Sequence, residues 1–228
     1  ALAFSANGSL TDLLRKQGFG HIRTYGPGGL ASPSFRGTGS SHTAVLWNGI
    51  NLASPLTGQL DFSLIPAGLF DNTSIQTGGS TSLSGNGSIG ANIHLNNNVN
   101  FNEGLNTTAS AYAGSFGTYY YDAGLRFSNK KFGTSTKVFW NESQNDFKFK
   151  NRNIFPSETQ RRMHSAFDLK GVLQQLHWQS AKLGIFSVKL WYQTSKYESP
   201  NPTTIIRESQ AIEEDEFYRG LVGWNYGR

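Results

Sequence analysis

The sequence has 228 residues and a mass of 25.1 kDa, which suits one domain or two small ones. Its 26 glycines exceed the usual share of about 7%, and its charged fraction of 15% is below the ~25% of soluble domains. With 13% aromatic residues and a mean hydropathy of −0.42, it is not the sequence of a helical bundle. The absence of cysteine excludes disulfides, zinc-thiolate sites and cysteine nucleophiles. No apolar run reaches the ~18–20 residues of a membrane-spanning helix, so any membrane contact requires strands.

The charge pattern does not favour a nucleic-acid partner. The net charge is +5 and the pI about 9.4, but the basic residues are spread thinly and meet only in pairs, Lys130-Lys131 and Arg161-Arg162. We therefore interpret the charge as a solvated surface. The chain starts at Ala1 without a signal sequence, so we expect any export signal to lie upstream.

The first 97 residues predict a small globular α+β unit with long loops. Ser9 can cap a short helix whose leucines, Leu10, Leu13 and Leu14, share one face and which ends near Gly18. The dipeptide Asn48-Gly49 is a strong hairpin signal. Short strands are predicted at residues 21–25, 34–36, 43–47, 50–52, 70–77 and 89–95.

From about residue 105 the sequence changes to long alternating strands. Between residues 118 and 127, aromatic and aliphatic residues occupy every second position, from Tyr119 to Phe127, over about the length of a transmembrane β-strand. In residues 167–174, Phe167, Leu169 and Leu173 alternate with polar residues in the same way. Further strands are predicted at residues 105–113, 137–141, 186–193 and 218–227.

The connections alternate in length, as in outer-membrane barrels. Those at 128–133 and 180–182 are short, whereas those at 143–160 and 196–215 are long and polar; the short one at 115–117 departs from this rule. A soluble β-sandwich also alternates, and its core would use the same aromatic residues that could form interfacial rows in a barrel. Periodicity alone does not separate the two classes.

The motifs of the first segment, in their order, resemble the plug domain of TonB-dependent outer-membrane receptors. They are residues 9–14 (SLTDLL), 25–30 (YGPGGL), 34–37 (SFRG), 42–51 (HTAVLWNGIN), 58–66 (GQLDFSLIP) and 78–95 (GGSTSLSGNGSIGANIHL). Ser84 and Ala91 stand where the family usually has Tyr and Gly. The resemblance covers nearly the whole segment and is nearest to the cobalamin-transporter branch.

The resemblance implies a mainly β fold, with an α+β plug domain at residues 1–97 inside a 22-stranded antiparallel transmembrane β-barrel. Residues 98–228 would then be the N-terminal strands of that barrel. Only 131 residues follow Asn97, which is enough for about six strands. We therefore expect the N-terminal part of a longer receptor in the cell outer membrane, with a TonB-binding box upstream if it has one.

Residues 25–31 and 51–59 match apical plug loops that face the ligand in cobalamin-type receptors. The implied substrate-binding residues are Tyr25, Gly28, Gly29, Leu30, Asn51, Leu52, Ser54, Leu56, Thr57 and Gln59. Their mixture of apolar surface and neutral hydrogen-bonding groups suits a bulky, mostly uncharged ligand. Arg36 matches an arginine that contacts the barrel wall. The alternative is that these side chains only pack or are solvated.

The resemblance implies an energised importer with no cofactor. Cobalamin or a related corrinoid is the expected ligand, and a ferric siderophore or haem is the alternative. The implied partners are TonB with its proton-motive-force-driven inner-membrane complex, outer-membrane lipid, the small-molecule ligand and a surface lipoprotein. Two further classes stay open: a receptor-like assembly component that transports nothing, and a soluble β-rich binding module.

No catalytic or metal site is predicted. Residues 85–90 read G-x-G-x-x-G, but the alternation that follows predicts a strand, whereas a dinucleotide site requires a helix. The five histidines lack metal-ligand spacing, and no serine lies in G-x-S-x-G. The acidic run Glu213–Glu216 is interpreted as a solvated loop, with calcium binding as its alternative. We therefore expect no enzyme.

Overall fold

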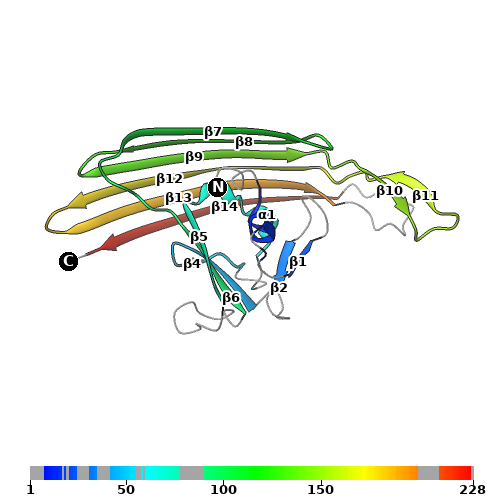
Figure 1. Ribbon diagram of the computed structural model, residues 1–228, viewed down its shortest axis with the longest axis horizontal. Coiled ribbons are helices and arrows are strands. Elements are labelled where there is room, and N and C mark those ends of the chain that lie inside the picture. The colour runs from blue at the N-terminus through cyan, green and yellow to red at the C-terminus, as the bar shows by residue number, and fades with distance from the viewer. Residues whose placement is uncertain are drawn as a thin grey trace. The chain divides into compact units, whose positions relative to one another are not determined.

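A computed structural model describes residues 8–16, 18, 21–24, 31–34, 42–54, 58, 60–77, 90–199 and 211–226. The chain divides into two units, Ala1–Asn98 and Val99–Arg228. Figure 1 shows the elements of each unit.

The first unit begins with α1 (Leu10–Lys16), which confirms the predicted helix. The Asp12 carboxylate accepts hydrogen bonds from the backbone N and Oγ of Ser9, both at 3.2 Å, and so closes the first turn. Leu10, Leu13 and Leu14 are buried. Gly18 follows the helix with a φ of +70°, a left-handed conformation that glycine adopts without strain.

A four-stranded mixed sheet forms the centre of this unit, in the order β4-β3-β6-β5. Its strands are β3 (Thr43–Trp47), β4 (Ile50–Asn51), β5 (Asn72–Thr77) and β6 (Ala91–Asn96). The β3–β4 hairpin turns at Asn48 and Gly49, whose φ values of 46° and 91° confirm the predicted turn. All five residues of β3 are buried, and β3 pairs in parallel with β6.

The remaining elements of the first unit are short. β1 (His21–Thr24) and β2 (Ala31–Ser34) form a separate antiparallel pair. The predicted strand at 34–36 overlaps β2 at Ser34, and its residues 35 and 36 lie outside the described residues. Two 3-10 turns, η2 (Phe62–Leu64) and η3 (Ala67–Leu69), add the buried Phe62 and Leu69 to the core.

The second unit contains one six-stranded antiparallel sheet, in the order β14-β13-β12-β9-β8-β7 (Figure 1). Apart from the inserted hairpin described next, each strand pairs with its predecessor in the chain, so the sheet is a meander and the expectation of about six strands is confirmed. The strands are β7 (Gly104–Gly114), β8 (Thr118–Ser128), β9 (Phe132–Ser143), β12 (Phe167–Ser180), β13 (Gly184–Glu198) and β14 (Ile212–Asn225).

One expectation about the connections is incomplete, and another is wrong. The polar stretch after β9 contains a separate hairpin of β10 (Lys148–Asn151) and β11 (Glu158–Arg161). The acidic run Glu213–Glu216 lies within β14 rather than in a loop, because β13 and β14 pair as far as Glu198 and Ile212. The strands thus continue beyond the alternating apolar segments from which they were predicted.

Candidate functional site

The six-stranded sheet has an exposed apolar face and a buried, largely polar one. On β8, Tyr119, Tyr121, Leu125 and Phe127 are 40–50% exposed, whereas Tyr120 between them is buried. On the paired strands, the residues in register with this set lie on the same face, where apolar side chains alternate with polar ones such as Thr107, Thr134 and Thr136. The members of this apolar face include Leu105, Val138, Trp140, Leu176, Trp178, Val188, Leu190, Tyr218, Val222 and Trp224.

The opposite face carries the polar side chains. Its buried members include Ser135, Gln175, His177, Lys189 and Gln193. Three aromatic rings on this face, those of Tyr120, Phe139 and Trp191, are also buried, and the centre of the Trp191 ring lies 5.3 Å from the Arg219 guanidinium. In a water-soluble sandwich the apolar face would be the covered one, so this sheet has the polarity expected when lipid contacts its exposed face.

Two rows of aromatic side chains cross the apolar face. The turn-side row lies near the short connections, where Trp178, Phe186 and Trp224 stack with centroids 5.5 and 5.9 Å apart. The Trp224 indole also donates to the Leu183 carbonyl at 2.6 Å. This places a polar indole edge and an apolar ring together, as in the interfacial belts of membrane proteins.

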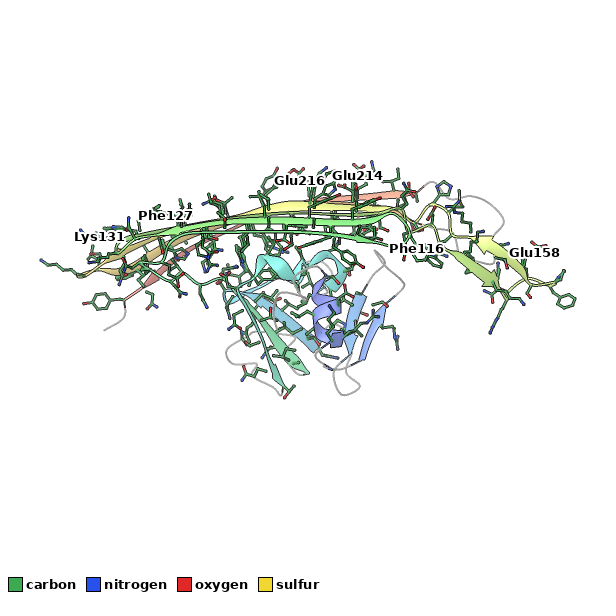
Figure 2. The ribbon with its side chains drawn as sticks, turned by 45° about the horizontal axis from the view of Figure 1, so that its top comes forward. Phe116, Phe127, Lys131, Glu158, Glu214 and Glu216 are labelled. Atoms are coloured by element: carbon green, nitrogen blue, oxygen red, sulfur yellow. The ribbon has the colours of Figure 1, made fainter. Side chains whose placement is uncertain are left out.

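The loop-side row lies near the longer connections. It contains the pair Tyr121 and Trp140, with centroids 6.0 Å apart, and the stacked pair Tyr192 and Tyr218, at 4.7 Å. Both hydroxyls of the second pair donate to Glu216 Oε1, at 2.8 and 2.7 Å. Figure 2 shows Glu216 and Glu214 projecting from one face of the sheet, well removed from the end where Lys131 lies.

Between the two rows the face is mostly apolar. Phe186 and Tyr192 are six residues apart on β13, which corresponds to roughly 20 Å along the strand. This matches the band of about 25 Å in outer-membrane barrels. The polar members of the band, Gln174, Thr134 and Thr136, hydrogen-bond to one another at 2.6 and 3.0 Å, which satisfies their polar atoms away from water.

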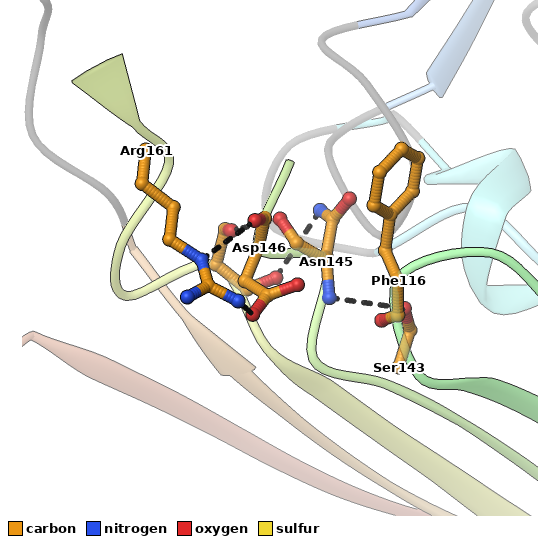
Figure 3. Close-up of polar contacts among 6 residues, drawn as sticks. Phe116, Ser143, Asn145, Asp146 and Arg161 are labelled. Carbon is orange, nitrogen blue, oxygen red and sulfur yellow. Dashed lines mark hydrogen bonds and ion pairs between the residues drawn. The ribbon is translucent and has the colours of Figure 1, made fainter. Parts of the chain in front are cut away.

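Asn145 organises the chain just beyond the loop-side row (Figure 3). Its backbone N donates to the carbonyl of Phe116 at 3.1 Å, and its amide donates to the Ser165 carbonyl at 3.2 Å. The Ser165 hydroxyl returns a bond to the Asn145 carbonyl at 2.7 Å. Asn145 therefore ties the β7–β8 turn to the segment that enters β12.

An ion pair and an aromatic cluster hold the β10–β11 hairpin to the segment that follows β9. Arg161 pairs with the carboxylate of Asp146 and also donates from Nε to the Asp146 carbonyl at 3.1 Å (Figure 3). Phe147 packs against Phe116 and Phe149, with ring centroids 5.8 and 6.3 Å apart. The aromatic cluster and the ion pair fix the base of the hairpin.

Most of the predicted substrate-binding residues lie outside the described residues: Tyr25, Gly28, Gly29, Leu30, Leu56, Thr57 and Gln59, together with Arg36. Of the others, Asn51 is exposed and its Oδ1 accepts from the Ala53 backbone N at 2.9 Å. Ser54 is half-buried. Leu52 is buried, and its backbone N donates to the Val45 carbonyl at 2.9 Å. Asn51, at the end of β4, and Ser54, just after it, thus expose surface, whereas Leu52 contributes to the core.

Asp61, in the segment that resembles the plug motif of residues 58–66, joins two parts of the first unit. Its Oδ1 accepts from the backbone N of Ala31 and of Ser63, both at 2.9 Å. Burial raises the pKa of the Asp61 carboxyl, and the two backbone hydrogen bonds offset this only in part. The sequence analysis missed this structural role, although the cap position before Phe62 was a visible signal.

The part of the chain that the structure describes contains no cluster of His, Asp or Glu side chains that could hold a metal ion. Within the same residues, no helix has the length and apolar character needed to cross a membrane. The G-x-G-x-x-G sequence is followed by strand β6, as predicted, and not by the helix that a dinucleotide site requires.

Comparison with known proteins identifies the first unit. Residues 2–92 match the family model described as the TonB-dependent receptor plug domain. A search of curated proteins found no match.

Several solved structures have a similar fold over most of the chain. The copper transporter OprC aligns with a TM-score of 0.66 and 19% identity, over 83% of this chain and 28% of that one. The pyoverdine receptor FpvA of Pseudomonas aeruginosa PAO1 aligns with a TM-score of 0.64 and 14% identity, over 86% of this chain and 27% of that one. The FrpB iron transporter of Neisseria meningitidis (F5-1 variant) aligns with a TM-score of 0.63 and 16% identity, over 95% of this chain and 33% of that one.

The fold is thus that of a plug domain followed by strands that match the N-terminal part of TonB-dependent receptor barrels, and the predicted fold class is confirmed. TonB-dependent receptors reside in the bacterial outer membrane, which agrees with the exposed apolar face of the sheet. The family consists of transporters rather than enzymes. The chain spans about a third or less of the length of OprC, FpvA and FrpB.

Proposed function

We propose that this chain is the N-terminal part of a TonB-dependent importer, with residues 1–97 as the plug domain and residues 98–228 as the first strands of a 22-stranded barrel. The observation that carries the proposal is the plug domain followed by a sheet whose apolar face is exposed between two aromatic rows. TonB, driven by the inner-membrane complex, would remodel the plug and release the bound ligand.

The proposed ligand is a metal chelate, with a ferric siderophore as the first candidate. Its support is that the three similar structures are described as a copper transporter, a pyoverdine receptor and an iron transporter. Cobalamin, expected from the motifs of the plug, is the second candidate, and haem a third. None of OprC, FpvA and FrpB is described as a cobalamin receptor.

The sequence-derived site residues belong to this proposal. Tyr25, Leu30, Leu52 and Leu56 would contribute apolar surface from the apical loops, with Gly28 and Gly29 allowing a close approach. Asn51, Ser54, Thr57 and Gln59 would hydrogen-bond the ligand. Arg36 would contact the barrel wall. A surface lipoprotein remains a proposed partner.

The test is uptake by intact cells. Radiolabelled ferric siderophores, haem and cobalamin are supplied to cells with the receptor, without it, and with the receptor but without TonB. The proposal predicts uptake of one of these ligands that requires both proteins. Binding without any TonB-dependent uptake would instead favour a receptor-like assembly component that transports nothing.

A further inference from the structure

Lysines near the loop-side end of the six-stranded sheet are paired with acidic neighbours. Lys196 forms an ion pair with Glu214 at 2.5 Å, and Lys170 forms one with Asp168 at 3.4 Å. The charge of these lysines is therefore compensated within the sheet itself. In Figure 2, Glu214 lies well removed from Lys131, which marks the turn-side end.

The turn-side end carries three lysines without such neighbours. Lys130 and Lys131 lie in the β8–β9 turn, and Lys182 lies in the β12–β13 turn. All three are exposed, and within the part of the chain that the structure describes none of them forms an ion pair. Residues 128–133 and 178–186 contain neither Asp nor Glu. The two turns therefore present positive charge that the sheet does not neutralise.

The pairing of β9 with β12 brings these two turns together. Phe132, the first residue of β9, pairs with Trp178 near the end of β12. Just beyond this pair, the backbone N of Gln179 donates to the Lys131 carbonyl at 2.7 Å. Lys131 and Lys182 thus belong to neighbouring turns at one edge of the sheet, and their charges act on the same region.

The lysine ammonium groups take no part in holding the turns. In the β8–β9 turn, Asn129 Oδ1 accepts from the backbone N of Lys131 at 2.9 Å and of Phe132 at 2.8 Å. In the β12–β13 turn, the Ser180 hydroxyl oxygen accepts from the backbone N of Lys182 and of Leu183, both at 3.4 Å. Because short side chains fix both turns, the lysine side chains are available to a ligand.

Apolar side chains border the lysines on the exposed face. Trp178 and Leu183 are about half exposed, and Phe132 is 39% exposed. A lysine can lay its apolar stem along such a surface and hold its ammonium group at the polar boundary. A phospholipid has the complementary arrangement, with a phosphate at the boundary and acyl chains beside the apolar surface.

We infer that Lys130, Lys131 and Lys182, here called the turn-side lysine cluster, bind the headgroup of an anionic glycerophospholipid. Short connections lie on the periplasmic side of outer-membrane barrels, so the lipid belongs to the periplasmic leaflet. Charge complementarity selects an anionic headgroup, because clustered lysines at a membrane surface attract anionic lipid. A zwitterionic headgroup would also need an acidic partner for its ammonium group, and neither turn contains one. The inference goes beyond the proposed function, because this lipid is not the imported ligand.

The experiment measures photolabelling of the receptor that contains this chain, reconstituted in phosphatidylcholine vesicles. The probes are phosphatidylglycerol and phosphatidylethanolamine, each at a low fraction and each with a diazirine on an acyl chain near the glycerol. Mass spectrometry of peptides measures the label on residues 178–186. The variant is Lys131→Gln with Lys182→Gln, and Lys131→Arg with Lys182→Arg conserves the charge. The matched control, Lys170→Gln with Lys196→Gln, removes two exposed lysines that already have acidic partners.

We expect phosphatidylglycerol to label residues 178–186 about tenfold more than phosphatidylethanolamine does, and the Gln variant to lose this preference. The Arg variant and the control should label as wild type does, and added salt should weaken the preference. The mobility of unheated and heated samples in dodecyl sulfate gels checks that each variant is folded.

Equal labelling by the two lipids would overturn the inference and would favour a soluble anionic partner in the periplasm instead. Equal effects of the Gln variant and its control would also overturn it. A Gln variant that does not fold would assign the lysines a structural role, with the same consequence. The importer proposal is tested by uptake and does not depend on this result, so either proposal can fail alone.

Discussion

The two units of this chain place the same kinds of side chain in opposite environments. In the first unit, Trp47, Phe62 and Leu95 are buried, as in any water-soluble domain. In the second, Leu190, Val222 and Trp224 are more than half exposed. The difference agrees with a first unit that folds in water and a second unit whose exposed face contacts lipid. The burial of an apolar side chain therefore has a different meaning in each unit.

The largest expected effect tests the core of the first unit. Trp47→Ala removes a fully buried indole that donates from Nε1 to Asn97 Oδ1 at 2.9 Å. We expect a loss of about 3–5 kcal/mol of unfolding free energy in this unit. Hydrogen exchange of β3 and β6 measures it, with the exposed Ile50→Ala as control. Equal exchange in the two variants would mean that Trp47 is not a core residue.

The second-largest effect tests whether the exposed face of the second unit contacts lipid or water. Leu125→Arg places a charge in the apolar band, whereas the neighbouring Arg126 lies on the opposite face. In lipid this substitution should cost about 2–4 kcal/mol. In water it would be close to neutral at a residue that is 50% exposed. Denaturant titration of the protein in lipid vesicles measures the cost, with Leu125→Met as the matched control. A charged variant as stable as the control would contradict a lipid-facing band.

A smaller effect is expected at Asn97, one of the buried polar residues of the first unit. Its Nδ2 donates to the Leu69 carbonyl at 2.7 Å, and its Oδ1 accepts from Trp47. Asn97→Ala leaves both partners without this bond, and we expect a loss of about 1–3 kcal/mol. Thermal unfolding of this variant beside Asn98→Ala, an adjacent exposed position, measures it. A cost no larger than that of the control would show that water replaces these bonds.

The smallest effect is the pH dependence contributed by Asp61. Because burial raises its folded pKa above the unfolded value, the folded state binds the proton more tightly. The stability that Asp61 contributes to the folded state is therefore fully present below the unfolded pKa and is lost as the pH rises through the folded pKa. Asp61→Asn keeps the Oδ1 acceptor and should remove this pH dependence from the unfolding free energy. Identical pH profiles for wild type and variant would contradict the assignment.

The sequence predicted those features that depend on local chemistry. Asn48-Gly49 predicted the β3–β4 turn because few dipeptides adopt two positive φ values. It did not predict which face of β12 is exposed. Leu169 and Leu173 alternate with Asp168 and Lys170, yet they lie on the buried face, because cross-strand register places the exposed face at the alternate residues.

The β10–β11 hairpin also escaped prediction. Phe149 alternates with Lys148 and Lys150 in β10, but the strand has only four residues, and β11 has no apolar residue. Phe147 packs against Phe116, which lies more than thirty residues earlier in the chain. Because such contacts join residues that are far apart in the sequence, no local pattern indicates them. The predicted ligand residues came from resemblance to plug motifs, and no local pattern of charge or spacing indicated them.

The exposure of alternate residues on β13 tests the central claim most directly. Nitroxide labels at residues 187–190, introduced through single cysteines in a segment that has none, report access to oxygen in lipid and to a water-soluble nickel chelate. The account predicts that labels at Val188 and Leu190 contact lipid, with high oxygen access and little nickel access, whereas those at Ser187 and Lys189 do not. Nickel access equal at all four positions, or highest at Val188 and Leu190, would contradict a lipid-facing sheet.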